Sequence, residues 1–262
     1  MENHFTDSTI GSEDAQDEIL HSWKISPKSL FYFRCSAGIY GILGILYICL
    51  MTWPAVPKEY FFLTNWGHTI TAAYFIMVSI YYFKYNSSPK QETEGSLLGR
   101  IIPFVAQTIF AMEVLILFLF WTILAKDIIP GHLQKPYPRN ILSTTLSILL
   151  HGVTPLCIIL DIVFNMISFQ LKKGFVVLFV FCTVYGITNY IGTQVLERPV
   201  YKPMTWESFV SVLFMIGMFG FACLNLWLGH LLQQWKARRT VKSTVLTDEN
   251  ASISYCTNNI CL

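Results

Sequence analysis

The sequence predicts an all-α fold: a polytopic membrane protein with a bundle of six transmembrane helices and cytoplasmic N- and C-termini. Three observations predict it. Of the 262 residues, 53% are hydrophobic and only 13% are charged, whereas a typical soluble domain is about 25% charged. Apolar stretches recur that reach the roughly 20 residues needed to cross a bilayer. Basic residues are also distributed unequally between the two sets of connections.

Six apolar windows carry the predicted helices, at residues 35–54, 60–83, 101–125, 141–164, 174–194 and 206–232. The connections between them are too short to hold a separate soluble domain. We therefore expect one transmembrane domain over residues 30–235. A disordered cytoplasmic N-tail over 1–29 and a disordered cytoplasmic C-tail over 236–262 complete the chain, because both are polar and poor in apolar groups.

The basic residues predict the orientation. Twelve Lys and Arg residues fall in the two tails and in the second and fourth connections, against six in the other three connections. By the positive-inside rule, both termini are expected to be cytoplasmic. The sequons that begin at Asn86 and Asn250 would then face the cytoplasm and stay unglycosylated.

Net charge and cysteine content limit the classes of binding partner that the sequence predicts. A formal net charge of +2 does not indicate a nucleic-acid partner. The seven cysteines have no spacing typical of a disulfide framework or a zinc site, and they read as small core residues. No cofactor and no metal are expected. The expected partners are membrane lipids and a hydrophobic ester substrate, and the sequence leaves protein partners unknown.

Polar side chains follow one face of two predicted helices. Thr64, His68 and Thr71 are four and three residues apart, which places them on one face of an α-helix. A longer stripe, in and directly after window 141–164, contains Thr144, Ser147, His151, Thr154, Asp161 and Asn165. Because lipid cannot satisfy such groups, both stripes are expected to face other helices or a water-filled cavity.

Pro155 and the predicted depths of Glu113 and Asp161 in the membrane affect which groups His151 can contact. Proline has no N–H for the carbonyl four residues earlier, which belongs to His151, so we expect a kink there. Glu113 and His151 lie at nearly the same predicted depth, which would allow a hydrogen bond between them. Asp161 is ten residues beyond His151, about 15 Å along a helix, so it cannot orient the imidazole directly.

Each of these residues also has a structural interpretation. Threonines in membrane helices usually bond their own helix or join helices, and spacing alone favours this role for Thr64. A Glu113–His151 pair that only fixes packing fits as well as chemistry does. His68 could join that pair in a metal site, but no typical spacing supports one. A proton path through Glu113, His151 and Asp161 would suit a carrier, although no repeat symmetry is visible.

Four segments resemble a known family: LTNWG at 63–67, FWTILAKD at 120–127, HGVTPLCIILD at 151–161 and YKPMTW at 201–206. On these, the chain resembles the rolling stone proteins and, more distantly, the androgen-induced gene family of six-helix membrane proteins. The androgen-induced branch implies a membrane-embedded hydrolase of fatty acid esters of hydroxy fatty acids. The rolling stone branch implies a role in cell fusion instead.

The resemblance also implies the catalytic residues. Phe62-Leu63-Thr64 matches the family's Phe-Leu-Thr, and His151 precedes Asp161 by ten residues, where the androgen-induced branch has Glu at the same spacing. Thr64 and His151 are therefore the implied catalytic pair. The sequence departs from the pattern just before His151, because the family's Asn-His-Gly is absent and the glycine follows the histidine.

The expected chemistry is acyl transfer to Thr64. A hydroxyl nucleophile needs a base within about 2.6–3.2 Å, and neutral His151 would supply it, with Glu113 holding the tautomer. Asn65 and Asn189 are the expected oxyanion donors. On straight helices Thr64 and His151 would differ in depth by about 9 Å, which tilt or the kink must close. The alternative is a non-catalytic multi-pass membrane protein acting in cell fusion, adhesion or signalling.

Overall fold

The computed structural model describes residues 19–20, 22–87, 96–125 and 138–258, and the regular elements of these ranges are helices. The α-helices are α2 (Pro27–Thr52), α3 (Val56–Glu59), α4 (Leu63–Ser87), α6 (Leu97–Leu119), α8 (Pro138–Phe164), α9 (Leu171–Leu196) and α10 (Phe209–Asn258). A π-helix, η1 (Phe120–Leu124), continues α6. The predicted all-α class is confirmed.

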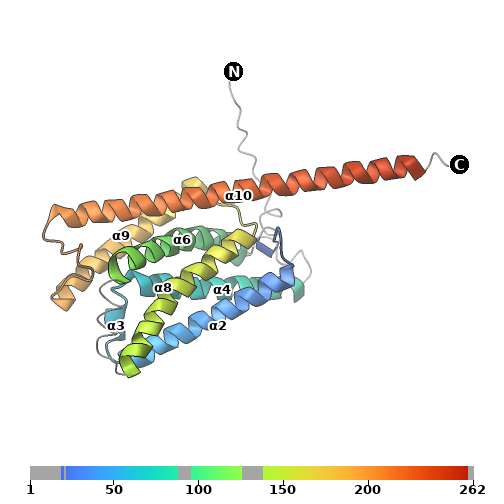
Figure 1. Ribbon diagram of the computed structural model, residues 1–262. Coiled ribbons are helices and arrows are strands. Elements are labelled where there is room, and N and C mark those ends of the chain that lie inside the picture. The colour runs from blue at the N-terminus through green and yellow to red at the C-terminus, as the bar shows by residue number, and fades with distance from the viewer. Residues whose placement is uncertain (1–18, 21, 88–95, 126–137, 259–262) are drawn as a thin grey trace, which may run out of the picture.

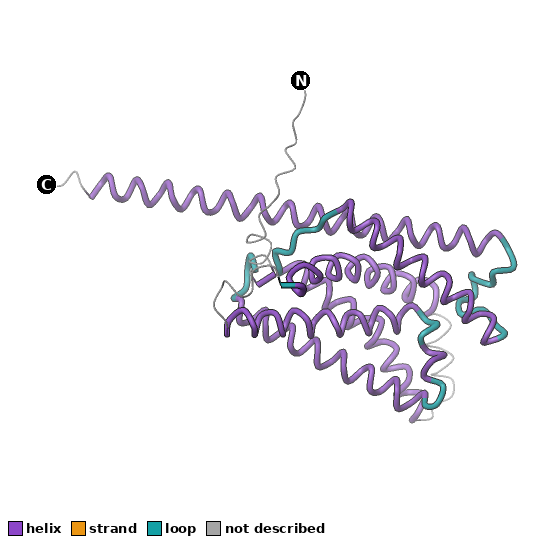
Figure 2. The backbone as a smooth tube through the Cα atoms, turned by 180° about the vertical axis from the view of Figure 1, so that it is seen from behind, coloured by secondary structure: helices purple, strands orange, loops and turns teal. Residues whose placement is uncertain are grey.

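The long helices form one bundle with its connections at the two ends (Figures 1 and 2). The start of α2 and the far end of α10 lie at the same end of this bundle, and α10 extends well beyond it. The connections after α2 and α9 lie at the opposite end. The arrangement therefore puts the two ends of the described chain on one side of the bundle.

Among the described residues, five helical segments are long and apolar enough to cross a bilayer: Pro27–Thr52, Leu97–Ile123, Thr144–Phe164, Leu171–Leu196 and Phe209–Thr240. The protein is thus an integral, multi-pass membrane protein. Helix α4 has 25 residues, which is long enough, but it is not among the five. It packs against α2, α6 and α8, so its polar residues can be satisfied inside the bundle. The sixth predicted span stays a prediction.

Local sequence signals set several helix ends. Ser26 caps α2, because its hydroxyl accepts the N–H of Ser29 at 3.1 Å, and Pro27 occupies the first helical position, where its missing N–H costs nothing. Ser96 caps α6 in the same way, with the N–H of Gly99 at 3.2 Å. Helix α9 ends at Leu196, and the next residue, Glu197, has a φ of 53° in the left-handed region.

Glycines let α4 lie close to two neighbouring helices. A Cβ on Gly41 of α2 would lie 2.6 Å from the Cβ of Ala72. A Cβ on Gly67 of α4 would lie 2.7 Å from Oε1 of Glu113 on α6. Small residues at such contacts allow the close backbone approach that stabilises membrane helices. As a result α4, which carries Thr64, is held between α2 and α6.

A buried polar cluster surrounds Asp161 near the C-terminal end of α8. The carboxylate accepts Arg34 Nε at 2.7 Å, the Tyr74 hydroxyl at 2.6 Å and Asn165 Nδ2 at 2.8 Å. Arg34 also donates to the carbonyl of Ile19 at 2.7 Å. These bonds tie the segment before α2 to α4 and α8.

Residues on both flanks of the predicted membrane domain pack against it. Ile19 and Leu20 are buried, and the indole of Trp23 donates to the carbonyl of Val163 at 2.6 Å. Predicted disorder over 1–29 therefore does not extend to these residues, while 1–18 lie outside the described ranges. The chain from 236 is also helical as far as Asn258. At the start of this stretch, the buried ammonium of Lys236 donates to the carbonyl of Ile162 at 2.6 Å.

Candidate functional site

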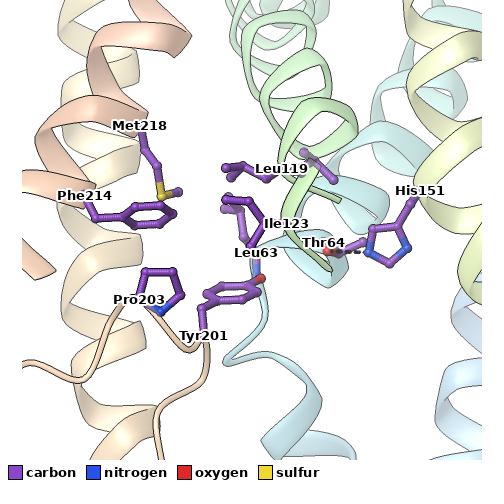
Figure 3. Close-up of a pocket in the computed structure, with 10 residues that line it drawn as sticks. Leu63, Thr64, Leu119, Ile123, His151, Tyr201, Pro203, Phe214 and Met218 are labelled. Atoms are coloured by element: carbon purple, nitrogen blue, oxygen red, sulfur yellow. Dashed lines mark hydrogen bonds between the residues drawn. The ribbon is translucent and has the colours of Figure 1, made fainter. Parts of the chain in front are cut away.

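Thr64 of α4 and His151 of α8 form a direct hydrogen bond, with Oγ1 and Nε2 3.0 Å apart (Figure 3). The other imidazole nitrogen, Nδ1, lies 2.7 Å from the carbonyl oxygen of Ser147. A carbonyl only accepts, so Nδ1 carries the hydrogen. In the neutral imidazole Nε2 is then an acceptor, and the Thr64 hydroxyl donates to it. The predicted convergence of these two side chains is confirmed.

The crossing of the two helices explains how residues of different predicted depth can meet. Thr64 lies in the first turn of α4, whereas His151 lies in the middle of α8. Helix α8 runs obliquely to α4 rather than parallel to it (Figure 1). The depth difference expected for straight, parallel helices therefore does not separate the pair. Helix α8 is helical from Pro138 to Phe164 with Pro155 inside it.

Phe120 fixes the plane of the His151 ring. The two rings are stacked, with centroids 3.9 Å apart and planes 17° apart. Phe120 is fully buried and begins the π-helical turn η1. Such turns frequently occur at functional sites, because the extra residue redirects side chains. Sequence reasoning missed this residue as part of the site, and the only signal was its place in the FWTILAKD segment.

Tyr201, from the connection between α9 and α10, is the second residue that sequence reasoning missed. Its phenol oxygen accepts the N–H of Leu63 at 3.0 Å, one of the first-turn N–H groups that have no acceptor within their helix. Burial raises the pKa of the Tyr201 phenol, and hydrogen bonds with Tyr185, Leu63 and Thr64 oppose that rise. With a raised pKa, the phenol keeps its proton at neutral pH.

Two cavities meet at Thr64, His151 and Tyr201, because these three residues line both. The first is narrow, with about 30 Å³ of free space. Its other lining residues are apolar: Leu63, Ile116, Leu119, Ile123, Pro203, Phe214 and Met218 (Figure 3). The second holds about 500 Å³ and adds the polar residues Thr52, Glu59, Asn65 and Ser147. An ester carbonyl at Thr64 would thus have an apolar space on one side and a more polar one on the other.

Glu113 does not contact His151, so the expected hydrogen bond between them is wrong. The carboxylate instead accepts the hydroxyl of Thr71 at 2.9 Å, and both groups are buried. The close approach of α4 and α6 at Gly67 holds Glu113 against α4. The His151 tautomer is held by the backbone of Ser147, not by an acid.

His68 also lies outside the two cavities, and it joins three helices. Its Nε2 lies 3.1 Å from the carbonyl oxygen of Gly41, and its Nδ1 lies 3.1 Å from the Thr154 hydroxyl. Asp161 belongs to the Arg34 cluster described above. In the described part of the chain no three His, Cys, Asp or Glu residues are placed to hold a metal. In the same described residues, Glu113 bonds Thr71, His151 bonds Thr64 and Ser147, and Asp161 bonds Arg34, Tyr74 and Asn165, so no direct hydrogen bond links the three groups expected to form a proton path.

The two asparagines expected as oxyanion donors are both engaged elsewhere. Asn65 lines the larger cavity, but its side-chain amide donates to the carbonyl of Glu59 at 2.8 Å. Burial raises the pKa of the Glu59 carboxyl, and the hydrogen bond with Asn65 partly offsets this rise. Asn189 lines neither cavity, and its amide oxygen accepts the indole N–H of Trp206 at 2.9 Å. Its side-chain N–H donates to the Tyr185 hydroxyl at 3.2 Å rather than into either cavity.

A family model described as FAR-17a/AIG1-like protein matches residues 33–234. The matched range begins within α2 and ends within α10, so it includes all the residues that line the two cavities. No curated protein and no solved structure matches the chain.

Proposed function

Because the chain belongs to the FAR-17a/AIG1-like family of membrane proteins, we propose that it is an intramembrane hydrolase of lipid esters. In this proposal Thr64 is the nucleophile and His151 is the general base and acid. One observation carries it: the 3.0 Å hydrogen bond between Thr64 Oγ1 and His151 Nε2, at the junction of an apolar and a more polar cavity. This is the contact that a hydroxyl nucleophile requires with its base.

The reaction proceeds through an acyl-enzyme. Oγ1 of Thr64 attacks the ester carbonyl while Nε2 of His151 takes the hydroxyl proton, and the carbonyl oxygen becomes an oxyanion. Collapse breaks the bond to the alcohol, which leaves with the proton from His151. Water then attacks the acyl-threonine and gives a proton to His151. This proton returns to Oγ1 as the fatty acid departs. Throughout, the Ser147 carbonyl holds Nδ1 at 2.7 Å, as the acid does in serine triads.

The two cavities suit an ester with unequal sides. In this proposal the acyl chain lies on the side of the apolar cavity, which at about 30 Å³ must widen to admit it. The larger cavity, with Glu59 and Asn65 in its wall, takes the departing hydroxy compound. Fatty acid esters of hydroxy fatty acids have this form. Substrate would enter from the bilayer, because both cavities lie among the apolar helices. We propose six spans, of which α4 is the sixth beside the five apolar helices. If both termini are cytoplasmic, the start of α4, and Thr64 with it, lies in the outer half of the bundle.

Paired substitutions test the proposal. Thr64→Ala and His151→Ala should each lower ester hydrolysis by the purified protein by about 10³-fold or more, and the double variant should lose little further, because residues that act as one unit are strongly non-additive. Folded yield should stay close to that of the parent. Ser79→Ala is the matched control, since this α4 hydroxyl bonds only the Phe75 carbonyl of its own helix, at 2.7 Å.

The non-catalytic alternative predicts another outcome. If the pair only joins α4 to α8, each substitution should cost about 1 kcal/mol of stability, as interhelical hydrogen bonds in bilayers do. Any hydrolysis would then fall only in proportion to folded protein. Labelling by a fluorophosphonate probe gives an independent readout, and labelling that persists in Thr64→Ala would rule out Thr64 as the nucleophile.

A further inference from the structure

An ester carbonyl attacked by Thr64 becomes an oxyanion, which needs hydrogen-bond donors about 2.7–3.1 Å away. The asparagines leave this role open, because Asn189 lines neither cavity and donates to the Tyr185 hydroxyl at 3.2 Å, and one N–H of Asn65 is bonded to the Glu59 carbonyl. Tyr201 lines both cavities beside Thr64. We propose that Tyr201 donates its phenol O–H to the oxyanion and is therefore a catalytic residue. This inference rests on the proposed hydrolase function.

The backbone of α4 places the phenol next to the nucleophile. The N–H that donates to the Tyr201 oxygen at 3.0 Å belongs to Leu63, the residue directly before Thr64. Figure 3 shows Tyr201 and His151 on opposite sides of Thr64. A carbonyl carbon at Oγ1 would therefore have the base on one side and the phenol on the other. Acyl transfer needs this division, because the proton leaves Oγ1 on one side while negative charge grows on the carbonyl oxygen.

The Tyr201 ring is held in place before substrate binds. The backbone carbonyl of Tyr201 accepts the N–H of Met204 at 2.8 Å, and this hydrogen bond closes a turn in the connection between α9 and α10. The ring packs edge to face against Phe62, with centroids 6.0 Å apart. A donor fixed in this way stabilises the oxyanion without reorganising during the reaction.

The surroundings also make the phenol a better donor. An O–H whose oxygen already accepts a hydrogen bond is polarised, and successive bonds of this kind strengthen one another. The same oxygen accepts from the N-terminal turn of α4, where the helix dipole places partial positive charge. Negative charge on a carbonyl oxygen near Thr64 is favoured by both effects.

Tyr201→Phe in the full-length protein tests the role, because it removes the hydroxyl and keeps the ring. We expect kcat to fall by about 10²–10³-fold, as it does when an oxyanion donor is removed elsewhere, with KM nearly unchanged. Tyr40→Phe is the matched control. It also removes a phenol hydrogen bond, to the carbonyl of Leu149 at 2.9 Å, but Tyr40 lines neither of the two cavities.

A binding measurement separates catalysis from structure. A trifluoromethyl ketone analogue of the ester forms a tetrahedral adduct with Thr64, so its affinity should fall with kcat in Tyr201→Phe. Affinity for an uncleavable ether analogue should not change. Tyr201→His retains an N–H donor and should therefore recover part of the lost kcat. This variant also tests the role if Tyr201→Phe folds poorly.

The outcomes distinguish the two proposals. An unchanged kcat, a change confined to KM, or an unchanged affinity for the ketone would overturn the role of Tyr201 and leave the hydrolase intact. Hydrolysis that survives Thr64→Ala would instead overturn the proposed function, and the role of Tyr201 with it.

Discussion

The imidazole of His151 is held at three points by residues from three helical segments. The Ser147 carbonyl lies 2.7 Å from Nδ1, the Thr64 hydroxyl lies 3.0 Å from Nε2, and Phe120 stacks on the ring face. Together these contacts fix the tautomer and the orientation of the ring. If His151 acts as the base of the proposed hydrolase, it needs little further ordering when substrate binds, and such positioning is a large part of the rate enhancement by enzymes.

At the same scale, removal of one partner of the Arg34–Asp161 ion pair should be strongly destabilising. The two groups are 2.7 Å apart and their side chains are 2% and 0% exposed. Removing one partner leaves a buried charge without compensation, so Asp161→Asn should lower the free energy of unfolding by about 3–5 kcal/mol. Denaturant unfolding of the detergent-solubilised protein measures this.

The double variant Arg34→Met/Asp161→Asn serves as the control, because it removes both charges and should recover much of the lost stability. Hydrolysis per folded molecule should be unaffected in both variants, since neither residue lines the two cavities. Unfolding of Asp161→Asn at the parent denaturant concentration would contradict the assigned role of the ion pair.

Among the elements, α4 has the greatest influence on the site. It carries Thr64, and its contacts with α2, α6 and α8 set where that hydroxyl lies relative to His151. The π-helical turn η1 also shapes the site, because it begins at Phe120, whose ring stacks on His151. Small residues on α2 and α4 permit the close helix contacts on which this arrangement depends.

Packing of α2 against α4 should therefore be sensitive to one methyl group. In Gly41→Ala the new Cβ would lie 2.6 Å from the Cβ of Ala72, and overpacking of this kind costs about 1–3 kcal/mol. The matched control is Gly217→Ala on α10, where nothing lies within 4 Å of the new Cβ. That change should be neutral or stabilising by up to about 1 kcal/mol, because alanine favours helix. Thermal unfolding in detergent compares them, and equal midpoints would contradict the close approach.

For the molecule as a whole, the start of α2 and the end of α10 lie at one end of the bundle (Figure 1), and the excess of basic residues predicts that this end is cytoplasmic. Asn86 at the end of α4 and Glu207 before α10 are both exposed, so they can report the two sides. In sealed microsomes with the cytoplasmic face outward, an impermeant maleimide should label Asn86→Cys but label Glu207→Cys only after detergent.

The unmodified protein, with its seven cysteines, sets the background for this labelling. Asn86 and Asn250 should also be free of glycan in cells. The reverse labelling pattern, or a glycan on Asn86, would place Thr64 in the other leaflet.

Much of this architecture could be predicted from the amino-acid sequence. The membrane class and the positions of most helices follow from hydropathy and length, because a bilayer requires long apolar segments. Inward-facing polar stripes follow from helical spacing, since lipid cannot satisfy donors and acceptors such as His68 and Thr71. The Phe62-Leu63-Thr64 match and the spacing of His151 and Asp161 singled out the central pair through family resemblance.

Only the tertiary structure decided which polar groups become partners. Periodicity states which face of a helix a side chain occupies, but a hydrogen bond also depends on how two helices cross and where a connection returns. For this reason Glu113 bonds Thr71 rather than His151, and Ser147 takes over the tautomer. Tyr201 reaches the first turn of α4 from a connection more than a hundred residues away in the chain. Neither the crossing of α8 over α4 nor the π-helical turn at Phe120 leaves a periodic trace in the sequence, and both decide the geometry around Thr64.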